Sequence, residues 1–164
     1  MPTAKSALDR MIDRLTTQRT ALTWAAGAVS ARGMVMEVGL GRGRTYDHLR
    51  RLFPPRDILV FDHWLRVPPA LAPEEDRLFL GDFRETLPAV AERFGGLVRF
   101  VHADVGSGQP AEEDGIRDWL GGLLQPFLMP GALVLSDRPI GREEWRAVAV
   151  PGTRDWPYFG WRAG

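Results

Sequence analysis

The chain has 164 residues, 45% of them hydrophobic, and its 21 acidic side chains balance 21 basic ones. This length and composition suit one globular domain with a sizeable core. The balanced charge gives no argument for a nucleic-acid or membrane partner. Because cysteine is absent, disulfides, thiolate metal sites and cysteine nucleophiles are excluded. Residues 1–29 carry charges and do not resemble a secretory signal, and no run approaches the ~20 apolar residues of a membrane span, so we expect a cytoplasmic protein.

The amino-terminal part of the sequence predicts a helix, a strand and a second helix. Apolar residues at spacings of three and four predict an amphipathic helix over residues 6–26. Residues 34–38 form an apolar run that predicts a strand. After three glycines at alternate positions, a helical pattern covers residues 45–52 and ends at two prolines. A strand, a tight turn and a helix in this order bring backbone close to a bound nucleoside, since glycine permits positive φ and lacks a Cβ atom.

The remaining pattern alternates strands with helices. We predict strands at 57–62, 77–80, 97–102 and 132–135, and helices at 84–94 and 112–128. Such alternation predicts a mostly parallel sheet covered by helices on both faces. The tail differs, because residues 145–150 and 157–161 have the pattern of two strands paired as an antiparallel hairpin.

A carboxylate stands at the end of each of the five expected parallel strands. These residues are Glu37, Asp62, Asp82, Asp104 and Asp137. Ligands of parallel α/β sheets bind beyond the carboxyl ends of the strands, so we expect the five side chains to gather along one edge.

Two nucleoside ligands suit such an edge. A dinucleotide places its pyrophosphate after Gly-x-Gly-x-x-Gly, but Arg44 occupies the third glycine position, and carboxylates repel a pyrophosphate. S-adenosylmethionine has no phosphate and carries a ribose diol, an ammonium and a sulfonium. Carboxylates attract this ligand and accept charge-assisted hydrogen bonds from it. The acidic edge therefore favours S-adenosylmethionine.

The sequence resembles the class I S-adenosylmethionine-dependent methyltransferases in three places. These are the segment from Glu37 to Gly43, then Asp62, and then Gly81-Asp82-Phe83. The similarity covers roughly residues 34–140, and the tail is similar to the closing strands of that family. The resemblance implies an α/β, three-layer, Rossmann-like fold whose mostly parallel sheet has about seven strands and ends in an antiparallel C-terminal hairpin. It implies a single domain over 1–164, with an N-terminal helix within 1–30, a cofactor-binding core at 34–140 and the hairpin at 141–164.

The resemblance also implies a role for each matching residue. Glu37 and the glycine turn hold the methionine part of the cofactor. Asp62 binds both ribose hydroxyls, and Asp82 accepts from the adenine amino group. Asp104 faces the methyl-transfer region. The cofactor-binding residues that we predict are Glu37, Gly39, Leu40, Gly41, Gly43, Thr45, Asp62, His63, Trp64, Gly81, Asp82, Phe83 and Asp104.

Plainer interpretations stay open for several of these side chains. Asp62 and Asp82 are each suited to cap a helix, and Asp82 has Glu85 at capping-box spacing. Asp104 and Asp137 are equally compatible with solvated loop carboxylates.

Methyl transfer to a hydroxyl or amine requires positioning and, for some acceptors, a base. His102 and Asp104 share one face of a strand and are our candidate catalytic residues, although a packed strand histidine is the simpler interpretation of His102. Asp104 with Asp137 is also similar to the metal-dependent small-molecule O-methyltransferases. Arg138 stands where those enzymes have a metal-binding asparagine, so we predict no metal.

We therefore predict an enzyme that transfers a methyl group from S-adenosylmethionine to a small-molecule acceptor. The alternatives are a non-catalytic S-adenosylmethionine-binding protein or subunit and, less favoured, an NAD-dependent oxidoreductase. We expect no nucleic acid as partner, because the arginines at 42, 44, 50 and 51 suit a solvated helix face. The aromatic residues of the tail suit packing, and we expect some of them to contribute to a homodimer contact.

Overall fold

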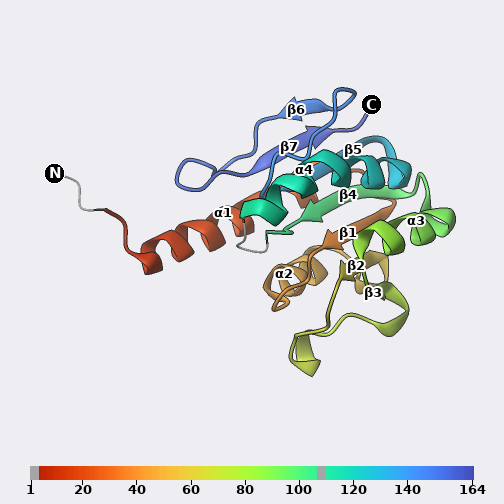
Figure 1. Ribbon diagram of the computed structural model, residues 1–164, viewed down its shortest axis with the longest axis horizontal. Coiled ribbons are helices and arrows are strands. Elements are labelled where there is room, and N and C mark those ends of the chain that lie inside the picture. The colour runs from red at the N-terminus through yellow and green to blue at the C-terminus, as the bar shows by residue number, and fades with distance from the viewer. Residues whose placement is uncertain (1–3, 107–109) are drawn as a thin grey trace.

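The computed structural model describes residues 4–106 and 110–164, with side chains for 4–106 and 115–164, and contains one seven-stranded sheet in the order β3-β2-β1-β4-β5-β7-β6 (Figure 1). The strands are β1 (Met34–Val38), β2 (Ile58–Asp62), β3 (Leu78–Leu80), β4 (Val98–Ala103), β5 (Leu128–Ser136), β6 (Arg146–Val148) and β7 (Phe159–Arg162). The five neighbouring strands β3, β2, β1, β4 and β5 run parallel, and β7 is antiparallel to both β5 and β6. The predicted parallel sheet and its antiparallel tail are both confirmed.

Four α-helices connect or precede the strands. They are α1 (Ala7–Ala28), α2 (Arg44–Leu52), α3 (Phe83–Phe94) and α4 (Pro110–Leu124). Short 3₁₀ turns lie at Pro55–Asp57, Pro69–Leu71, Glu75–Arg77 and Gln125–Phe127. Among the residues described, no helix has both the length and the apolar character needed to cross a membrane.

Local sequence signals explain where these helices begin. Ser6 caps α1 in a capping box with Asp9, so the amide of Asp9 and the amide of Ser6 both find side-chain partners. Gly43, with φ of 81°, starts α2 without a side-chain cap. Asp82 caps α3 by accepting the amide of Arg84.

One helix boundary differs from our expectation. We predicted a helix over 112–128, but α4 ends at Leu124 and a 3₁₀ turn over Gln125–Phe127 leads directly into β5. The physical reason is Pro126, which has no amide hydrogen to continue the α-helical pattern. β5 consequently begins at Leu128, four residues before the expected strand.

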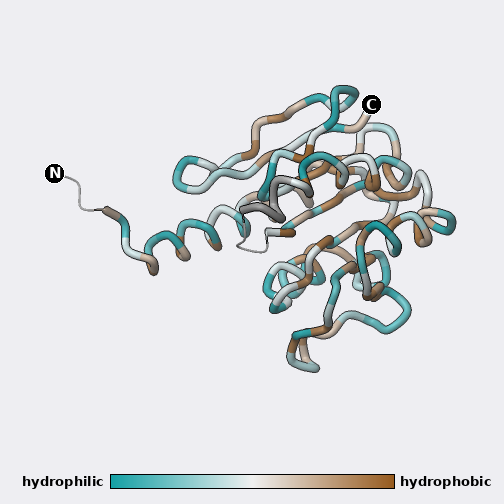
Figure 2. Tube along the Cα trace, viewed as in Figure 1, coloured by the Kyte–Doolittle hydropathy of each residue, from teal (hydrophilic) through white to brown (hydrophobic). Residues whose placement is uncertain are grey.

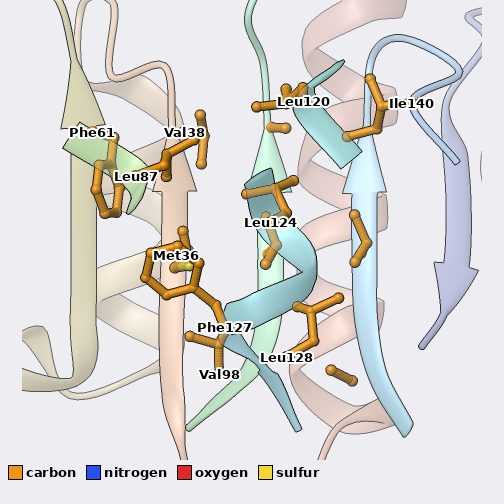
Figure 3. Packing of buried hydrophobic residues seen from close by; sticks show 14 of the residues in the cluster. Met36, Val38, Phe61, Leu87, Val98, Leu120, Leu124, Phe127, Leu128 and Ile140 are labelled. Carbon is orange, nitrogen blue, oxygen red and sulfur yellow. The ribbon is translucent and has the colours of Figure 1, made fainter. Parts of the chain in front are cut away.

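Two hydrophobic clusters cover the two faces of the sheet, and hydrophobic residues are concentrated along the strands (Figure 2). Met36 and Val38 point to the face covered by α3 and α4, where they join Leu87 and Leu124 (Figure 3). Val35, at the alternate position of β1, joins residues of α1 and α2 on the other face. The same alternation places Glu37 on the face covered by α1 and α2, together with His102, its neighbour in β4.

The amino-terminal half of α1 extends past the sheet (Figure 1). Its apolar side chains there are partly solvent-exposed: Leu8 at 69%, Met11 at 45%, Ile12 at 53% and Leu15 at 38%. Farther along the helix, Leu22 and Ala25 are buried against the sheet. α1 therefore packs on the domain with its second half and leaves apolar surface beside the carboxyl edge of the strands.

Candidate active site

A cleft of about 880 Å³ lies at the carboxyl edge of the parallel strands. The predicted residues that line it are Gly39, Gly41, Asp62, His63, Trp64, Asp82, Phe83 and Asp104. They lie at the carboxyl ends of β1, β2, β3 and β4 or just after them, as expected for a doubly wound sheet. The structure therefore brings together in one cleft the acidic residues that follow β2, β3 and β4.

The turn after β1 depends on glycine. Gly39, Gly41 and Gly43 have φ values of 93°, 53° and 81°. A Cβ atom on Gly39 would lie 2.1 Å from the carbonyl oxygen of Asp104, so only glycine allows the β1 and β4 loops to approach this closely. The structure thus confirms the positive φ that the glycine pattern predicts.

Asp62 holds this turn in place. One of its carboxylate oxygens, Oδ2, accepts the backbone amides of Leu40 at 2.8 Å and Gly41 at 2.9 Å. The other oxygen accepts the amide of His63 at 2.6 Å. Each carboxylate oxygen has two lone pairs, so Oδ1 retains capacity for a further donor from a ligand in the cleft.

Asp82 and Phe83 form the next part of the cleft wall. The Oδ1 atom of Asp82 accepts the amide of Arg84 at 2.8 Å, which makes Asp82 the cap of α3. The same side chain lines the cleft, so the capping role and a ligand role coexist in geometry. Phe83 packs edge-on against His63, with ring centroids 4.8 Å apart. The pair gives this end of the cleft an aromatic surface.

Asp104 is anchored by α1. Gln18 Nε2 donates to Asp104 Oδ2 at 2.7 Å, and Arg14 Nη2 approaches the same oxygen at 3.1 Å. Burial alone would raise the pKa of Asp104, but the charges of His102 and Arg14 outweigh that cost, and the pKa lies below its usual value. The carboxylate that we predicted to face the transferred methyl group is therefore charged and held by two side chains of α1.

Asp137 is the partner of Asp104 at the end of β5. Its carboxyl group lies near that of Asp104, and two neighbouring carboxyl groups favour a proton on one of them. Burial, reinforced by the charge of Asp104, raises the pKa of Asp137 to about 7. Arg138 Nη1 lies 3.3 Å from Asp137 Oδ2, where a cation would be repelled by the guanidinium. Among the side chains that the structure describes, those of residues 4–106 and 115–164, no three His, Asp or Glu come together as metal ligands, and the absence of a metal stays a prediction.

Glu37 and His102 form a buried pair beneath the cleft. Neither side chain is exposed to solvent, and Glu37 Oε1 lies 2.8 Å from Nδ1 of His102. Nε2 of His102 meets the hydroxyl of Tyr158, and Thr45 donates to Glu37 at 3.2 Å. Burial favours neutral imidazole, but the Glu37 carboxylate outweighs it and raises the pKa of His102. For Glu37, in contrast, burial is the cause of the raised pKa, because it disfavours the charged carboxylate.

These positions separate the predicted residues into two groups. Glu37, Gly43, Gly81 and His102 do not line the cleft, and Leu40 and Thr45 line a smaller neighbouring cavity instead. His102 is fully buried and does not line the cleft. This position agrees with the simpler interpretation of His102 as a packed strand residue. One oxygen of Glu37, Oε2, is buried without a partner, which is consistent with a donor group arriving from a ligand or a water.

Sequence reasoning missed several residues of the cleft. They are Arg66, Arg84, Val105, Gly106, Gly115, Ile116 and Trp119. The spacing of Ile116 and Trp119 indicated one apolar face of a helix. The spacing alone does not show whether such a face packs on the hydrophobic core or lines a cleft. Arg14 and Gln18 were missed as well, although two polar residues four apart on the apolar side of α1 were a usable signal.

The chemistry of the cleft fits an adenosyl cofactor with a positive charge. Asp62, Asp82 and Asp104 provide acceptors along the cleft, and Phe83 with Ile116 provides apolar surface for a base. The volume of the cleft is within the range of cofactor sites.

Comparison with known proteins agrees with this geometry. The sequence profile of the S-adenosyl-L-methionine methyltransferase family matches residues 5–160. The chain belongs to this family. As a member, it is an S-adenosylmethionine-dependent methyltransferase and uses S-adenosylmethionine as its cofactor. No curated protein matched the sequence significantly.

Solved structures show the same relationship. An S-adenosyl-L-methionine methyl transferase from Silicibacter pomeroyi DSS-3 is 38% identical, with a TM-score of 0.88 over 98% of this methyltransferase and 100% of that chain. A Corynebacterium glutamicum protein shares the fold at 11% identity, with a TM-score of 0.55 over 99% of this chain and 92% of that one. The predicted family and cofactor are therefore confirmed, while the roles of single site residues stay predictions.

Proposed function

We propose that this methyltransferase acts on a small-molecule acceptor bound beside Asp104. The observation that carries the proposal is a cavity of about 220 Å³ between α1 and the glycine turn, lined by Asp104, Arg14 and Met11 among others. It shares Gly39, Gly41, Asp104 and Gly106 with the larger cleft. A cavity of this volume has room for a small molecule.

The larger cleft is the proposed site of the donor. We assign the ribose to Asp62, whose Oδ1 retains a free lone pair, and the adenine to Asp82 and Phe83. The turn from Gly39 to Gly43, with Thr45, would hold the methionine part where the cleft meets the smaller cavity, which leaves the side of that cavity at Arg14 and Met11 for the acceptor. The unpartnered oxygen of Glu37 supports an acidic contact below that turn. His63 and Trp64 complete the wall beside the base.

The cofactor supplies an electrophilic methyl group on its sulfonium, and the protein contributes mainly positioning. Asp104 is the proposed residue that faces the acceptor and accepts a hydrogen bond or a proton from it. Gln18 and Arg14 fix its carboxylate, and Asp137 holds a proton next to it. Because His102 is buried between Glu37 and Tyr158, we assign it the support of Glu37 and not contact with the acceptor.

A methyl-transfer assay tests this proposal. Radiolabelled S-adenosylmethionine is offered to the protein with a panel of small alcohols, phenols, amines and carboxylates, and with RNA and protein extracts as macromolecular acceptors. Label should enter a small molecule. The Asp104→Asn variant should lower kcat by about a hundredfold, as is usual for a lost acid or base, while Glu92→Gln, exposed on α3, should not change it.

Label found only in macromolecules would refute the choice of acceptor. Binding of the cofactor without any product across the panel would instead support the alternative of a non-catalytic binding protein. An unchanged kcat in Asp104→Asn, on well-folded material, would remove Asp104 from the proposed mechanism.

We also propose a cytoplasmic location and a homodimer, both from the sequence. The dimer expectation rested on the aromatic residues of the tail, but Trp145, Tyr158 and Trp161 are buried within the chain. The exposed apolar face of α1 is a more direct reason to measure the mass in solution. Light scattering after size-exclusion chromatography would show one protomer mass if the dimer proposal is wrong.

A further inference from the structure

A buried glutamine stands on the face of α1 that packs against the sheet. Gln18 is only 3% exposed and lies among the buried residues Ala21, Leu22 and Ala25 of the same helix. A buried amide is expected to have hydrogen-bond partners, because leaving it unpaired costs free energy. Its Nε2 atom carries two hydrogens, and one of them is donated to Asp104 Oδ2 at 2.7 Å. The other neighbours of Gln18 are therefore connected to Asp104.

The hydroxyl of Tyr158 is one of these neighbours. Burial and the nearby carboxylates raise the pKa of this phenol, and the side chain of Gln18 lowers it from within hydrogen-bonding reach. The same hydroxyl meets Nε2 of His102, and the planes of the two rings differ by only 15°. A phenol hydroxyl can donate and accept at the same time, so Tyr158 can serve both neighbours.

His102 extends the connection to Glu37. The two residues face each other on β4 and β1, and Nδ1 of His102 lies 2.8 Å from Glu37 Oε1. Thr45 donates to the same oxygen at 3.2 Å. The other oxygen of Glu37, Oε2, is buried without a partner. It is therefore the oxygen that these contacts leave for the methionine part of the donor.

The contacts form one chain across the floor of the site, made of Glu37, His102, Tyr158, Gln18 and Asp104. Except for Asp104, every member is more than nine-tenths buried. Buried side chains in one hydrogen-bonded network have few alternative orientations, so fixing one of them restricts its neighbours. The hydroxyl of Tyr158 is the middle of the chain and lies between the carboxylate on the donor side and the carboxylate on the acceptor side.

We propose that Tyr158 is a positioning residue for methyl transfer. Through His102 it orients Glu37 at the methionine part of the donor. Through Gln18 it orients Asp104 beside the sulfonium and the acceptor. The inference rests on the proposed roles of these two carboxylates. A single hydroxyl then sets the two carboxylates relative to each other, and methyl transfer depends on such alignment of donor and acceptor.

Two ligands that differ by one charge test the two sides of the chain without turnover. S-adenosylhomocysteine has the amino-acid end of the donor and an uncharged sulfur, so its affinity reports on Glu37. S-adenosylmethionine adds the positive sulfonium. Its preference over S-adenosylhomocysteine therefore reports on a carboxylate beside the sulfur, which is Asp104 in this proposal. Calorimetry on the full chain measures both affinities for each variant.

Tyr158→Phe removes the hydroxyl and keeps the ring. We expect its affinity for S-adenosylhomocysteine to fall about fivefold, the order expected for the loss of one net hydrogen bond. We expect its preference for S-adenosylmethionine to fall about threefold, because Asp104 keeps its charge but loses its fixed orientation. Gln18→Met interrupts the acceptor side alone. It should lower the preference by about the same factor and leave the affinity for S-adenosylhomocysteine nearly unchanged.

Tyr46→Phe is the matched control. Tyr46 is the other tyrosine of the chain, is 2% exposed and lines neither the cleft nor the smaller cavity. Loss of its hydroxyl should change neither affinity. Asp104→Asn is the benchmark and should lower the preference about tenfold. Urea unfolding identifies variants that are not folded, and Gln18→Met keeps the acceptor side measurable if Tyr158→Phe is one of them.

Several results would overturn the inference. These are a change on one side of the chain only in Tyr158→Phe, equal losses in Tyr46→Phe, or an unchanged preference in Gln18→Met while Asp104→Asn lowers it. An unchanged preference in Asp104→Asn would refute the proposed place of Asp104 beside the sulfur, and the inference with it. Transfer to a small molecule is decided separately by the label assay and would survive each of these results.

Discussion

The Asp62 carboxylate accepts the backbone amide of Gly41 at 2.9 Å, which ties the end of β2 to the turn after β1. The same oxygen accepts the amide of Leu40. A side chain proposed to bind ribose therefore also fixes the turn proposed to hold the methionine part. Donor binding and the conformation of the turn are consequently linked through a single carboxylate.

Replacing Asp62 should affect both properties. In Asp62→Ala the amides of Leu40 and Gly41 lose their acceptor and the ribose loses its proposed partner. We expect affinity for S-adenosylhomocysteine to fall roughly ten- to a hundredfold, since a charge-assisted hydrogen bond contributes about 1.5–3 kcal/mol. Asp62→Asn keeps one acceptor oxygen and should lose less. Calorimetry on both variants checks this, and unchanged affinity in Asp62→Ala would remove Asp62 from the donor site.

Alanine substitutions at Gly39 and Gly41 should separate crowding from backbone strain. Both glycines have positive φ, but a Cβ atom at Gly39 would lie 2.1 Å from Asp104 O, whereas a Cβ at Gly41 meets nothing within 4 Å. We expect Gly41→Ala to cost about 1 kcal/mol and Gly39→Ala about 3 kcal/mol or more. Urea unfolding measures both values. Equal losses would contradict the close approach of the β1 and β4 loops.

The raised pKa of Asp137 predicts how stability depends on pH. The folded protein holds a proton on Asp137 up to about pH 7, whereas the unfolded chain releases it near 3.8. Between these values the folded state binds more protons, so the contribution of this group to stability is present at low pH and is lost as pH rises toward 7. Relative to Asp137→Asn, the unaltered protein should lose up to about 1.4 kcal/mol per pH unit in this window.

Denaturant unfolding at several pH values measures this difference. Glu92→Gln, exposed on α3, is the control and should follow the unaltered protein at every pH. A constant difference between the unaltered protein and Asp137→Asn from pH 4 to 7 would show that Asp137 ionises normally and does not share a proton with Asp104.

The hydroxyl of Tyr158 supports the buried pair of Glu37 and His102. Burial, with the nearby charges of Asp104, Asp137 and Glu37, raises the pKa of Tyr158 well above its ordinary value, so the phenol is neutral and keeps its proton for hydrogen bonding. Tyr158→Phe leaves His102 Nε2 without this partner. We expect a loss of about 1–3 kcal/mol in the free energy of unfolding, because the group left behind is fully buried. An unchanged unfolding midpoint would contradict the network.

Much of the fold was predictable, because local signals and the global pattern agree. The apolar run of β1, the glycines after it and the alternation of later strands indicated the parallel sheet. Asp82 was correctly recognised both as a cap and as a residue of the cleft edge. The end of α4 was mispredicted because apolar residues continue past Leu124, while Pro126 changes the backbone hydrogen bonding.

The site was less predictable, because its supports come from distant parts of the chain. Gln18 reaches Asp104 across 86 positions, and Tyr158 reaches His102 across 56. Nothing in the local pattern around either residue shows such a pairing. The register between Glu37 and His102 on neighbouring strands is likewise set by the packing of the sheet and not by either segment alone.

The measurement that tests the central claim most directly is a crystal structure of the full chain with S-adenosylhomocysteine. The account predicts the ribose at Asp62, the adenine beside Asp82 and Phe83, and the sulfur next to Asp104. A ribose away from Asp62, or a base away from Asp82, would contradict the assignment of the donor site.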